Sequence, residues 1–285
     1  MQRFALYHFS GTGNTAWLAD RLTEALAARG AEVSSAPIVR DDAPRLPDGP
    51  NTLVLCFPVY GLDAPPLVQE WSRRLPAGEG RGAVVVRSPG DPFFEGGTTR
   101  TMRRIVEERG WRVRVERMIV MPANVFVRVS DDLAALLLAA ARRRIGKLAA
   151  DIMSDKELLE DTGTFVHYCS RFCNQLLGRY GHRFGWDLST TAACVRCGLC
   201  ARECPAHSIT MGEKGPLFGD RCAVCLRCLA HCPQKAIPSR FYKRFSVEKY
   251  DLAALDAAGP EGREPRTWFE RRYGTYLREA EFSVP

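Results

Sequence analysis

The sequence predicts an α/β fold in which a doubly wound, five-stranded parallel sheet is followed by a helical middle segment and a small α+β domain. Three observations support this prediction. Short β-rich runs alternate with helical patterns over roughly the first 125 residues, which is typical of a parallel sheet covered by helices. The chain has 285 residues, enough for roughly two domains. Eight of its eleven cysteines fall between Cys194 and Cys232, where the alternation has ended.

The alternating region contains five candidate strands and three candidate helices. The strands are expected at 3–9, 32–38, 52–57, 83–87 and 113–120. The helices are expected at 14–28, 65–74 and 98–109. The runs at 53–57 and 83–86 are apolar throughout, as in central strands that are buried on both faces. Each helical pattern then provides a crossover between two parallel strands.

The pattern of the chain changes at Asp131. A long helical pattern covers 131–151, with Asp131 as its candidate cap. A second helix is expected within 156–177, and the Gly-, Ser- and Thr-rich stretch 178–193 is expected to be a loop. We therefore expect four parts: a sheet domain at 1–130, a helical connector at 131–190, a cysteine-rich domain at 191–238 and a C-terminal extension at 239–285 that folds back on either domain.

Two cysteine runs repeat one spacing, C-x₂-C-x₂-C-x₃-C-P, without a gap or substitution. The first run holds Cys194, Cys197, Cys200 and Cys204, and the second holds Cys222, Cys225, Cys228 and Cys232. Thiolates three residues apart can wrap one cubane, and in two-cluster ferredoxins the fourth thiolate ligates the other cluster. Carried over to this chain, that rule assigns one cluster to Cys194, Cys197, Cys200 and Cys232. It assigns the other cluster to Cys222, Cys225, Cys228 and Cys204.

Structural zinc is the alternative, because CxxC pairs also bind zinc. Zinc sites usually take two cysteines per knuckle, whereas each run here has four and ends in Cys-Pro. The spacing therefore predicts two 4Fe–4S clusters. The other three cysteines, Cys56, Cys169 and Cys173, lack such a pattern, and we expect them to be free thiols.

A glycine-rich turn follows the first strand and leads directly into a helix. It consists of Ser10, Gly11, Thr12, Gly13, Asn14 and Thr15. Backbone N–H groups at a helix N-terminus suit an anion, and the short hydroxyl and amide side chains add donors for a phosphate monoester. A dinucleotide fingerprint also fits from Gly11 to Ala16, but the second strand ends near Ile38 without the acidic residue that binds a ribose.

The segment Tyr7–Thr15, YHFSGTGNT, resembles the FMN-phosphate loop of flavodoxins. Together with the two cysteine runs, it makes the chain resemble the ferredoxin-fused flavodoxins of anaerobic bacteria and archaea. The resemblance implies a flavodoxin-like domain that binds FMN at 1–130 and a bacterial-type ferredoxin domain with two 4Fe–4S clusters at 191–238.

The resemblance also implies that the isoalloxazine lies between two loops, which follow the third and fourth strands. The first loop offers Pro58, Val59, Tyr60 and Gly61, with Tyr60 as the stacking candidate. The second loop offers Ser88, Gly90, Phe93, Phe94 and Gly97. In that loop a phenylalanine would cover the other face of the ring, and backbone groups near the glycines would bond its edge. Both loops fall at the carboxyl ends of strands, where doubly wound sheets bind ligands.

These cofactors together indicate a protein that relays electrons between two 4Fe–4S clusters and FMN, with redox proteins as donor and acceptor. The alternative is a flavin-dependent reductase that has its own small-molecule substrate and is fed through the clusters. A redox sensor, in which cluster loss changes a partner surface, is a third hypothesis. No Ser–His–Asp or paired-carboxylate pattern stands out, so no catalytic residue is predicted and an enzymatic activity is left open.

Composition and charge exclude several other classes. The formal net charge of +7 is dispersed without a long basic block, so no nucleic-acid partner is expected, and an acidic redox partner suits this charge equally well. No secretory signal opens the sequence, and no apolar run approaches the ~18 residues of a membrane span. We therefore expect a cytoplasmic protein without membrane insertion, and a homodimer is compatible with the sequence.

Overall fold

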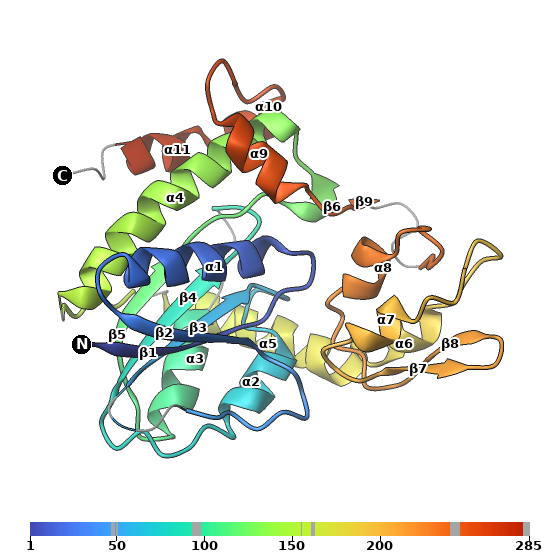
Figure 1. Cartoon of the computed structure of the whole chain (residues 1–285), viewed down its shortest axis with the longest axis horizontal. Helices are drawn as coiled ribbons and strands as arrows, with labels where there is room; N and C mark the ends of the chain where they lie inside the picture. Colours follow the sequence, from blue (N-terminus) through green and yellow to red (C-terminus); the bar gives the residue numbers. More distant parts are fainter. Residues whose placement is uncertain are drawn as a thin grey trace.

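The computed structural model describes residues 1–46, 49, 51–92, 98–154, 156–160, 163–239 and 246–281 (Figure 1). Its N-terminal part contains a five-stranded sheet. The strands are β1 (Arg3–His8), β2 (Glu32–Pro37), β3 (Thr52–Pro58), β4 (Gly82–Ser88) and β5 (Arg112–Met118). They lie in the order β2-β1-β3-β4-β5, and every neighbouring pair is parallel. This order is that of the flavodoxin-like doubly wound sheet, so the predicted fold class is confirmed.

Helices cover both faces of the sheet. The helices α1 (Asn14–Ala27) and α4 (Asp131–Met153) pack on one face, and α2 (Pro66–Ser72) and α3 (Thr98–Glu107) pack on the other. In α1, the buried residues Leu18, Leu22 and Leu26 recur every four positions, because this spacing keeps them on one side of a helix. The central strands β3 and β4 bury side chains on both faces, as their apolar sequences predict.

The long helix α4 falls within the predicted connector 131–190, yet its apolar side chains share one buried core with α1 and the sheet. It begins where the sequence predicts, but its cap is Ser130 and not Asp131. The Ser130 hydroxyl accepts a hydrogen bond from the Leu133 N–H at 3.2 Å, which satisfies a first-turn donor of the helix. Asp131 instead forms an ion pair with Arg128 at 2.7 Å.

The helix predicted within 156–177 is α5 (Thr164–Tyr180), and a short helix, α6 (Arg183–Asp187), follows it. The prediction of a loop at 178–193 is therefore wrong over its first half. The short helix α6 packs closely against a distant segment of the chain. A Cβ at Gly185 would lie only 2.1 Å from the carbonyl oxygen of Gly219. Glycine at this position lets the helix backbone lie directly against the cysteine-rich segment, which a local sequence pattern does not reveal.

The cysteine-rich segment is small and mixed, as predicted, and lies at the right-hand side of Figure 1. The strands β7 (Ile209–Gly212) and β8 (Gly215–Phe218) form an antiparallel hairpin between the two cysteine runs. The short helices α7 (Leu199–Arg202) and α8 (Arg227–His231) each begin inside a cysteine run. None of the helices in the described part of the chain has the length and apolar character needed to cross a lipid bilayer.

The C-terminal extension packs on the α1/α4 side of the sheet domain. Its first element, β9 (Ser246–Val247), pairs antiparallel with β6 (Asn124–Arg128). The helices α9 (Leu252–Ala258), α10 (Trp268–Arg271) and α11 (Gly274–Glu281) follow, and both α9 and α11 contact α4. The extension is thus a structural part of the sheet domain.

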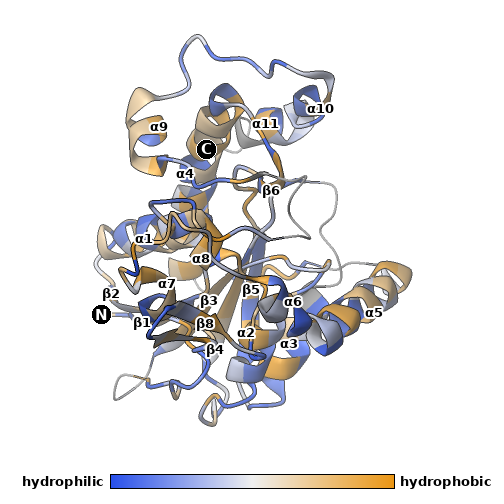
Figure 2. Ribbon diagram, turned by 90° about the vertical axis from the view of Figure 1, so that its right-hand side faces the viewer, coloured by the Kyte–Doolittle hydropathy of each residue, from blue (hydrophilic) through white to orange (hydrophobic). Residues whose placement is uncertain are grey.

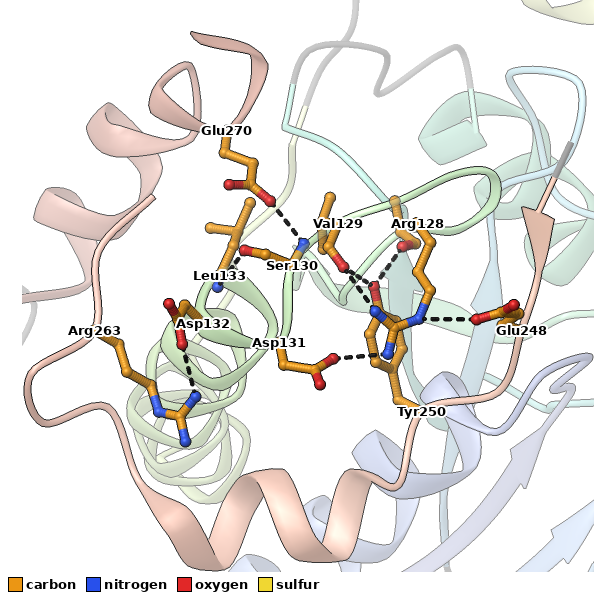
Figure 3. A network of polar contacts seen from close by, with 11 residues as sticks. Arg128, Val129, Ser130, Asp131, Asp132, Leu133, Glu248, Tyr250, Arg263 and Glu270 are labelled. Atoms are coloured by element: carbon orange, nitrogen blue, oxygen red, sulfur yellow. Dashed lines mark hydrogen bonds and ion pairs between the residues drawn. The ribbon is translucent and has the colours of Figure 1, made fainter. Parts of the chain in front are cut away.

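Polar contacts anchor the extension around the N-terminus of α4 (Figure 3). The carboxylate of Glu270 accepts a hydrogen bond from the Ser130 N–H at 2.6 Å. The Tyr250 hydroxyl donates to the Val129 carbonyl at 2.8 Å, and its ring lies 4.4 Å from the Arg128 guanidinium. These contacts place β9 and the residues after it next to the loop between β1 and α1.

Candidate functional site

The predicted phosphate loop lies at the carboxyl end of β1, immediately before α1. Its side chains Ser10, Thr12 and Thr15 are buried. Gly13 precedes the first helical residue with a left-handed φ of 106°, and no side chain caps α1. The N–H groups of the first helical turn therefore have no intrahelical acceptor and no capping side chain. Such an end suits an anion.

Hydrogen bonds fix the shape of this loop. The Gly13 N–H donates to the Ser10 hydroxyl oxygen at 3.2 Å. The hydroxyl groups of Thr15 and Ser88 lie 2.7 Å apart, which ties the loop to the end of β4. The Thr12 hydroxyl donates to the Asn124 side-chain oxygen at 3.0 Å, so β6 also contacts the loop.

Two buried atoms at this loop have no hydrogen-bond partner among the described residues. They are Oδ1 of Asn14 and Nδ2 of Asn124. A buried polar atom without a partner costs about 1–3 kcal/mol, so a ligand oxygen that accepts from Nδ2 of Asn124 would stabilise that side chain. Oδ1 of Asn14 is itself an acceptor and requires a donor from the ligand. The orphaned amide, the hydroxyls and the free N–H groups together fit a phosphate group.

A cation that the sequence analysis did not single out lies beside the same loop. The Cε atom of Lys249 is 3.7 Å from the position that a Cβ on Gly13 would occupy. The β6–β9 pairing places it there, across more than 200 residues of sequence. No local pattern marks Lys249, because it lies in a basic tail without a motif.

The first predicted isoalloxazine loop contains Pro58, Val59, Tyr60 and Gly61 and closes into a tight turn. The Tyr60 N–H donates to the Asp63 carbonyl at 2.8 Å, and the Asp63 N–H donates to the Tyr60 carbonyl at 3.2 Å. Asn174 of α5 donates to the Tyr60 carbonyl at 2.9 Å and holds the turn from outside. The Tyr60 hydroxyl oxygen lies 2.6 Å from where a Cβ on Gly11 would be, so this loop reaches the phosphate loop.

The second predicted isoalloxazine loop is described only in part. Ser88 is buried at the end of β4, and Gly90 lies against Ala123. The Tyr273 hydroxyl, from the C-terminal extension, donates to the Gly90 carbonyl at 2.8 Å and supports this loop. The remaining predicted residues, Phe93, Phe94 and Gly97, lie outside the described residues.

The cysteines of the two runs gather into two sets around separate cavities. One cavity is lined by Cys194, Cys197, Cys200 and Cys232, here named the outer cysteine set. The other is lined by Cys204, Cys222, Cys225 and Cys228, here named the inner cysteine set. Each set contains three cysteines of one run and the last cysteine of the other run. The structure therefore brings together the same two sets of four cysteines that the spacing rule predicts.

The backbone of the two cysteine runs follows the same path. Three equivalent pairs of residues adopt left-handed φ angles, two pairs within the runs and one pair just after them. They are Arg196 and Val224 (57° and 52°), Gly198 and Leu226 (74° and 60°), and His207 and Lys235 (47° and 46°). Such angles are unfavourable for residues other than glycine, most of all for a β-branched valine. The repeated strain indicates loops shaped to enclose a bound group.

Backbone N–H groups also point at cysteine sulfurs in both runs. The Ser208 N–H donates to Cys204 at 3.3 Å, and the Ala236 N–H donates to Cys232 at 3.4 Å. Burial raises the pKa of the Cys225 thiol to about 12. A thiol so buried needs nearby positive charge to ionise, and a bound metal would supply that charge.

Within the part of the chain that the structure describes, no three Cys, His, Asp or Glu side chains gather closely enough to ligate a single metal ion. A cubane makes a different demand on its ligands, because each thiolate binds a different iron and the four sulfurs stand apart around the cluster. Each of the two cavities is lined by four cysteines, the number of thiolates that one 4Fe–4S cluster takes. The other three cysteines, Cys56, Cys169 and Cys173, line neither of these cavities.

The inner cysteine set touches the phosphate loop directly. A Cβ on Gly11 would lie 2.1 Å from the carbonyl oxygen of Cys225, so the two backbones are in contact. Arg227, two residues further on, donates from Nε to the Ser10 carbonyl at 3.1 Å and from Nη1 to the Glu203 carbonyl at 3.1 Å. One guanidinium group thus links the phosphate loop to both cysteine runs.

The outer cysteine set lies toward solvent. Cys197 is exposed, whereas Cys225 of the inner set is only 9% exposed. Apolar side chains that reach solvent line the cavity of the outer set, with Val195 61% exposed and Met211 42% exposed. The outer set is therefore the one that a partner protein can approach.

Comparison with known proteins finds curated relatives of only part of the chain. No family model matches the chain. In its C-terminal region the chain is 42% identical over 62 residues to a component of the ion-translocating oxidoreductase complex of Methanosarcina acetivorans, covering 21% of this chain and 24% of that protein. It is 34% identical over 79 residues to the methylamine utilization ferredoxin-type protein MauM of Methylorubrum extorquens, covering 25% and 36% respectively. The chain thus spans about a quarter to a third of these curated relatives.

The strand order and these ferredoxin-type relatives together decide the architecture. The chain joins a flavodoxin-like domain to a ferredoxin-type domain. Oxidised flavodoxin 1 from Bacillus cereus is among the similar solved structures, with 14% sequence identity and a TM-score of 0.41. That comparison covers 54% of this chain and 98% of the flavodoxin.

Proposed function

We propose that this flavodoxin–ferredoxin chain is an electron-transfer protein that relays electrons between two 4Fe–4S clusters and FMN. FMN exchanges one or two electrons and each cluster exchanges one, so the pair couples one-electron to two-electron donors and acceptors. The protein supplies the positions and the surroundings of these groups. Its donor and its acceptor are redox proteins under this proposal.

One observation carries the proposal. The backbone of Cys225, in the inner set, lies against Gly11 of the phosphate loop, and the Tyr60 hydroxyl reaches the same point. A ligand of one predicted cluster, the predicted phosphate loop and the first predicted isoalloxazine loop therefore converge. Electron transfer needs cofactors held close together and fixed in orientation, and this backbone contact supports such an arrangement.

The residues that would hold each group follow from the site. Ser10, Thr12, Asn14 and Thr15 would bind the FMN phosphate with the N–H groups of the α1 N-terminus. Tyr60 would stack on the isoalloxazine. The outer set would hold a cluster that exchanges electrons with a partner, and the inner set would hold a cluster between it and FMN. The proposal holds for electron flow from the clusters to FMN or from FMN to the clusters.

Anaerobic purification followed by analysis of iron, sulfide and flavin tests the cofactor content. We expect about eight irons, eight sulfides and one FMN per chain. Rapid mixing with a one-electron reductant should then reduce the clusters before the flavin. Zinc without sulfide, or a flavin site that stays empty when FMN is added, would contradict the proposal. Steady turnover of quinones or nitro compounds without a protein partner would favour a reductase instead.

Arg227→Gln should slow electron transfer between the clusters and FMN. The substitution removes the charged donor that holds the Ser10 carbonyl, and such bonds contribute about 1.5–3 kcal/mol, or at least about tenfold in an equilibrium. We expect flavin reduction through the clusters to slow by about tenfold. The measurement is stopped-flow absorbance at flavin and cluster wavelengths.

The matched control for this variant is Arg202→Gln. Arg202 also lies in a cysteine run, but it donates to the Cys197 carbonyl at 2.8 Å, beside the outer set. We expect this control to keep the flavin reduction rate of the wild type. Equal slowing in both variants would show that loss of a basic side chain, and not the loop contact, is responsible.

Lys249→Met should weaken binding of FMN but not of riboflavin, which lacks the phosphate. A partly exposed ion pair contributes about 0.5–1 kcal/mol, so the Kd for FMN should rise roughly two- to fivefold. Flavin fluorescence titration at low and high salt measures both ligands. Lys147→Met, an exposed lysine of α4, is the control, and it should change neither Kd. An equal loss for riboflavin would place Lys249 away from the phosphate.

A further inference from the structure

The helix α5 has an unusual polarity. Its buried side chains, Ser170 and Asn174, are polar and face the sheet domain. Its outward face is apolar, and Figure 2 shows hydrophobic residues along much of the helix. Gln175 and Arg179 are also exposed. The large apolar side chains exposed at helical spacing are Phe165 (81%), Tyr168 (65%), Phe172 (62%), Leu176 (42%) and Tyr180 (46%). A surface helix of a globular protein normally turns its apolar side inward.

These exposed residues form one continuous stripe. Their spacings along the chain are three, four, four and four residues, which places them on one side of a helix. Trp186 of α6, which is 63% exposed, continues the apolar surface past the end of α5. A contiguous patch of this kind marks an interaction site. It is named the α5 face below.

The area of the α5 face is close to what a stable interface needs. On a scale of about 200 Å² per aromatic side chain, its five exposed rings alone offer about 600 Å². Standard interfaces bury about 800 Å² on each partner. The flanking aliphatic side chains Val166 and Leu176, both more than 40% exposed, bring the face near that value.

The stripe is also complementary to itself. If two copies of α5 pair antiparallel about a point between residues 172 and 173, Phe165 lies opposite Tyr180 of the other copy. Cys169 then lies opposite Leu176 and Phe172 lies opposite Cys173, so the centre of the contact is apolar. Arg179, which is also exposed, lies opposite Val166 toward each end. A two-fold symmetric interface requires this reciprocity, in which residue i contacts residue j and residue j contacts residue i. The centre of the pairing contains no charged side chain, because Arg171 lies on the flank of the helix.

We propose that the α5 face is the dimer interface of this protein, formed by a second copy of the same chain through antiparallel pairing of α5. The helix also supports the Tyr60 turn through Asn174, so the interface stands directly behind one predicted flavin loop. The proposal rests on the surface of α5 alone and does not depend on which cofactors the chain binds.

Sedimentation velocity of the anaerobically purified full chain tests this proposal. We expect a dimer for the wild type and a monomer for Phe172→Glu, with the dimer Kd raised at least a hundredfold. Phe172 is exposed in the single chain, so the substitution should leave the fold and cofactor content unchanged. Trp268→Glu is the matched control, because Trp268 is 78% exposed on α10, away from α5, and this variant should remain a dimer.

A charge-pair experiment tests the antiparallel geometry. Phe165→Glu should weaken the dimer, and adding Tyr180→Lys should restore it, because the two positions face each other across the two-fold axis. Adding Leu176→Lys to Phe165→Glu should not restore it. A wild-type monomer would overturn the proposal, as would equal dissociation by Trp268→Glu. A monomer that binds vesicles of anionic phospholipid through Phe172 would show that the face contacts a membrane instead.

Discussion

Replacing Cys225 with alanine is expected to remove one cluster and leave the other, so that iron falls from about eight to about four atoms per chain. Cys225 is buried in the same core as Phe9 at the end of β1, and its backbone lies on the phosphate loop. Electron transfer between the remaining cluster and FMN should therefore stop. Iron and sulfide analysis, with spectra of the reduced protein, measures the first effect, and stopped-flow absorbance measures the second.

A comparison of two cysteines from the first run makes this prediction sharper. Cys204 lies in the first run but lines the inner cavity, whereas Cys197 lines the outer cavity. Cys204→Ala should therefore behave like Cys225→Ala, and Cys197→Ala should keep the cluster next to FMN. Cys169→Ala, an exposed thiol of α5, should keep about eight irons. If Cys204→Ala behaves like Cys197→Ala, the crossed assignment of ligands is wrong.

Replacing Gly11 with alanine is expected to have the second large effect. The added Cβ would lie 2.1 Å from the Cys225 carbonyl oxygen and 2.6 Å from the Tyr60 hydroxyl oxygen, far inside van der Waals contact. Either the phosphate loop or the inner cysteine loop must move. Overpacking of this kind costs about 1–3 kcal/mol, which corresponds to roughly a five- to 150-fold rise in the Kd for FMN. Flavin titration of the purified protein measures this Kd.

Gly146→Ala is the control for this experiment. Gly146 lies in the interior of α4, and nothing within 4 Å would meet its Cβ. Alanine there should stabilise the helix by about 0.5–1 kcal/mol and leave FMN binding unchanged. The iron content of Gly11→Ala should stay near the wild-type value, because the change lies outside the cysteine runs. Wild-type flavin affinity in Gly11→Ala would show that this backbone contact does not shape the flavin site.

The sequence predicted the features that are encoded by neighbouring residues. Strand and helix periodicity indicated the five parallel strands, because buried strands and amphipathic helices each impose their own spacing. The phosphate loop is six consecutive residues, and each cysteine run is twelve. Such local sequence patterns are sufficient to predict the local backbone geometry. The spacing rule also grouped the cysteines into the two sets that the structure brings together.

Tertiary structure decided what depends on residues far apart in the chain. Arg227 reaches Ser10 across 217 positions, and Tyr273 reaches Gly90 across 183. No local pattern predicts such contacts, because they arise only when the ferredoxin-type domain and the C-terminal extension pack on the sheet domain.

The orientation of α5 is the clearest example of this difference. Its apolar spacing is readable in the sequence, and by itself would predict a stripe turned toward the core. The structure turns that stripe outward, because Asn174 and Ser170 on the opposite side are the residues that become buried. A helical pattern shows which residues share a face, but only the surrounding packing determines which face is buried.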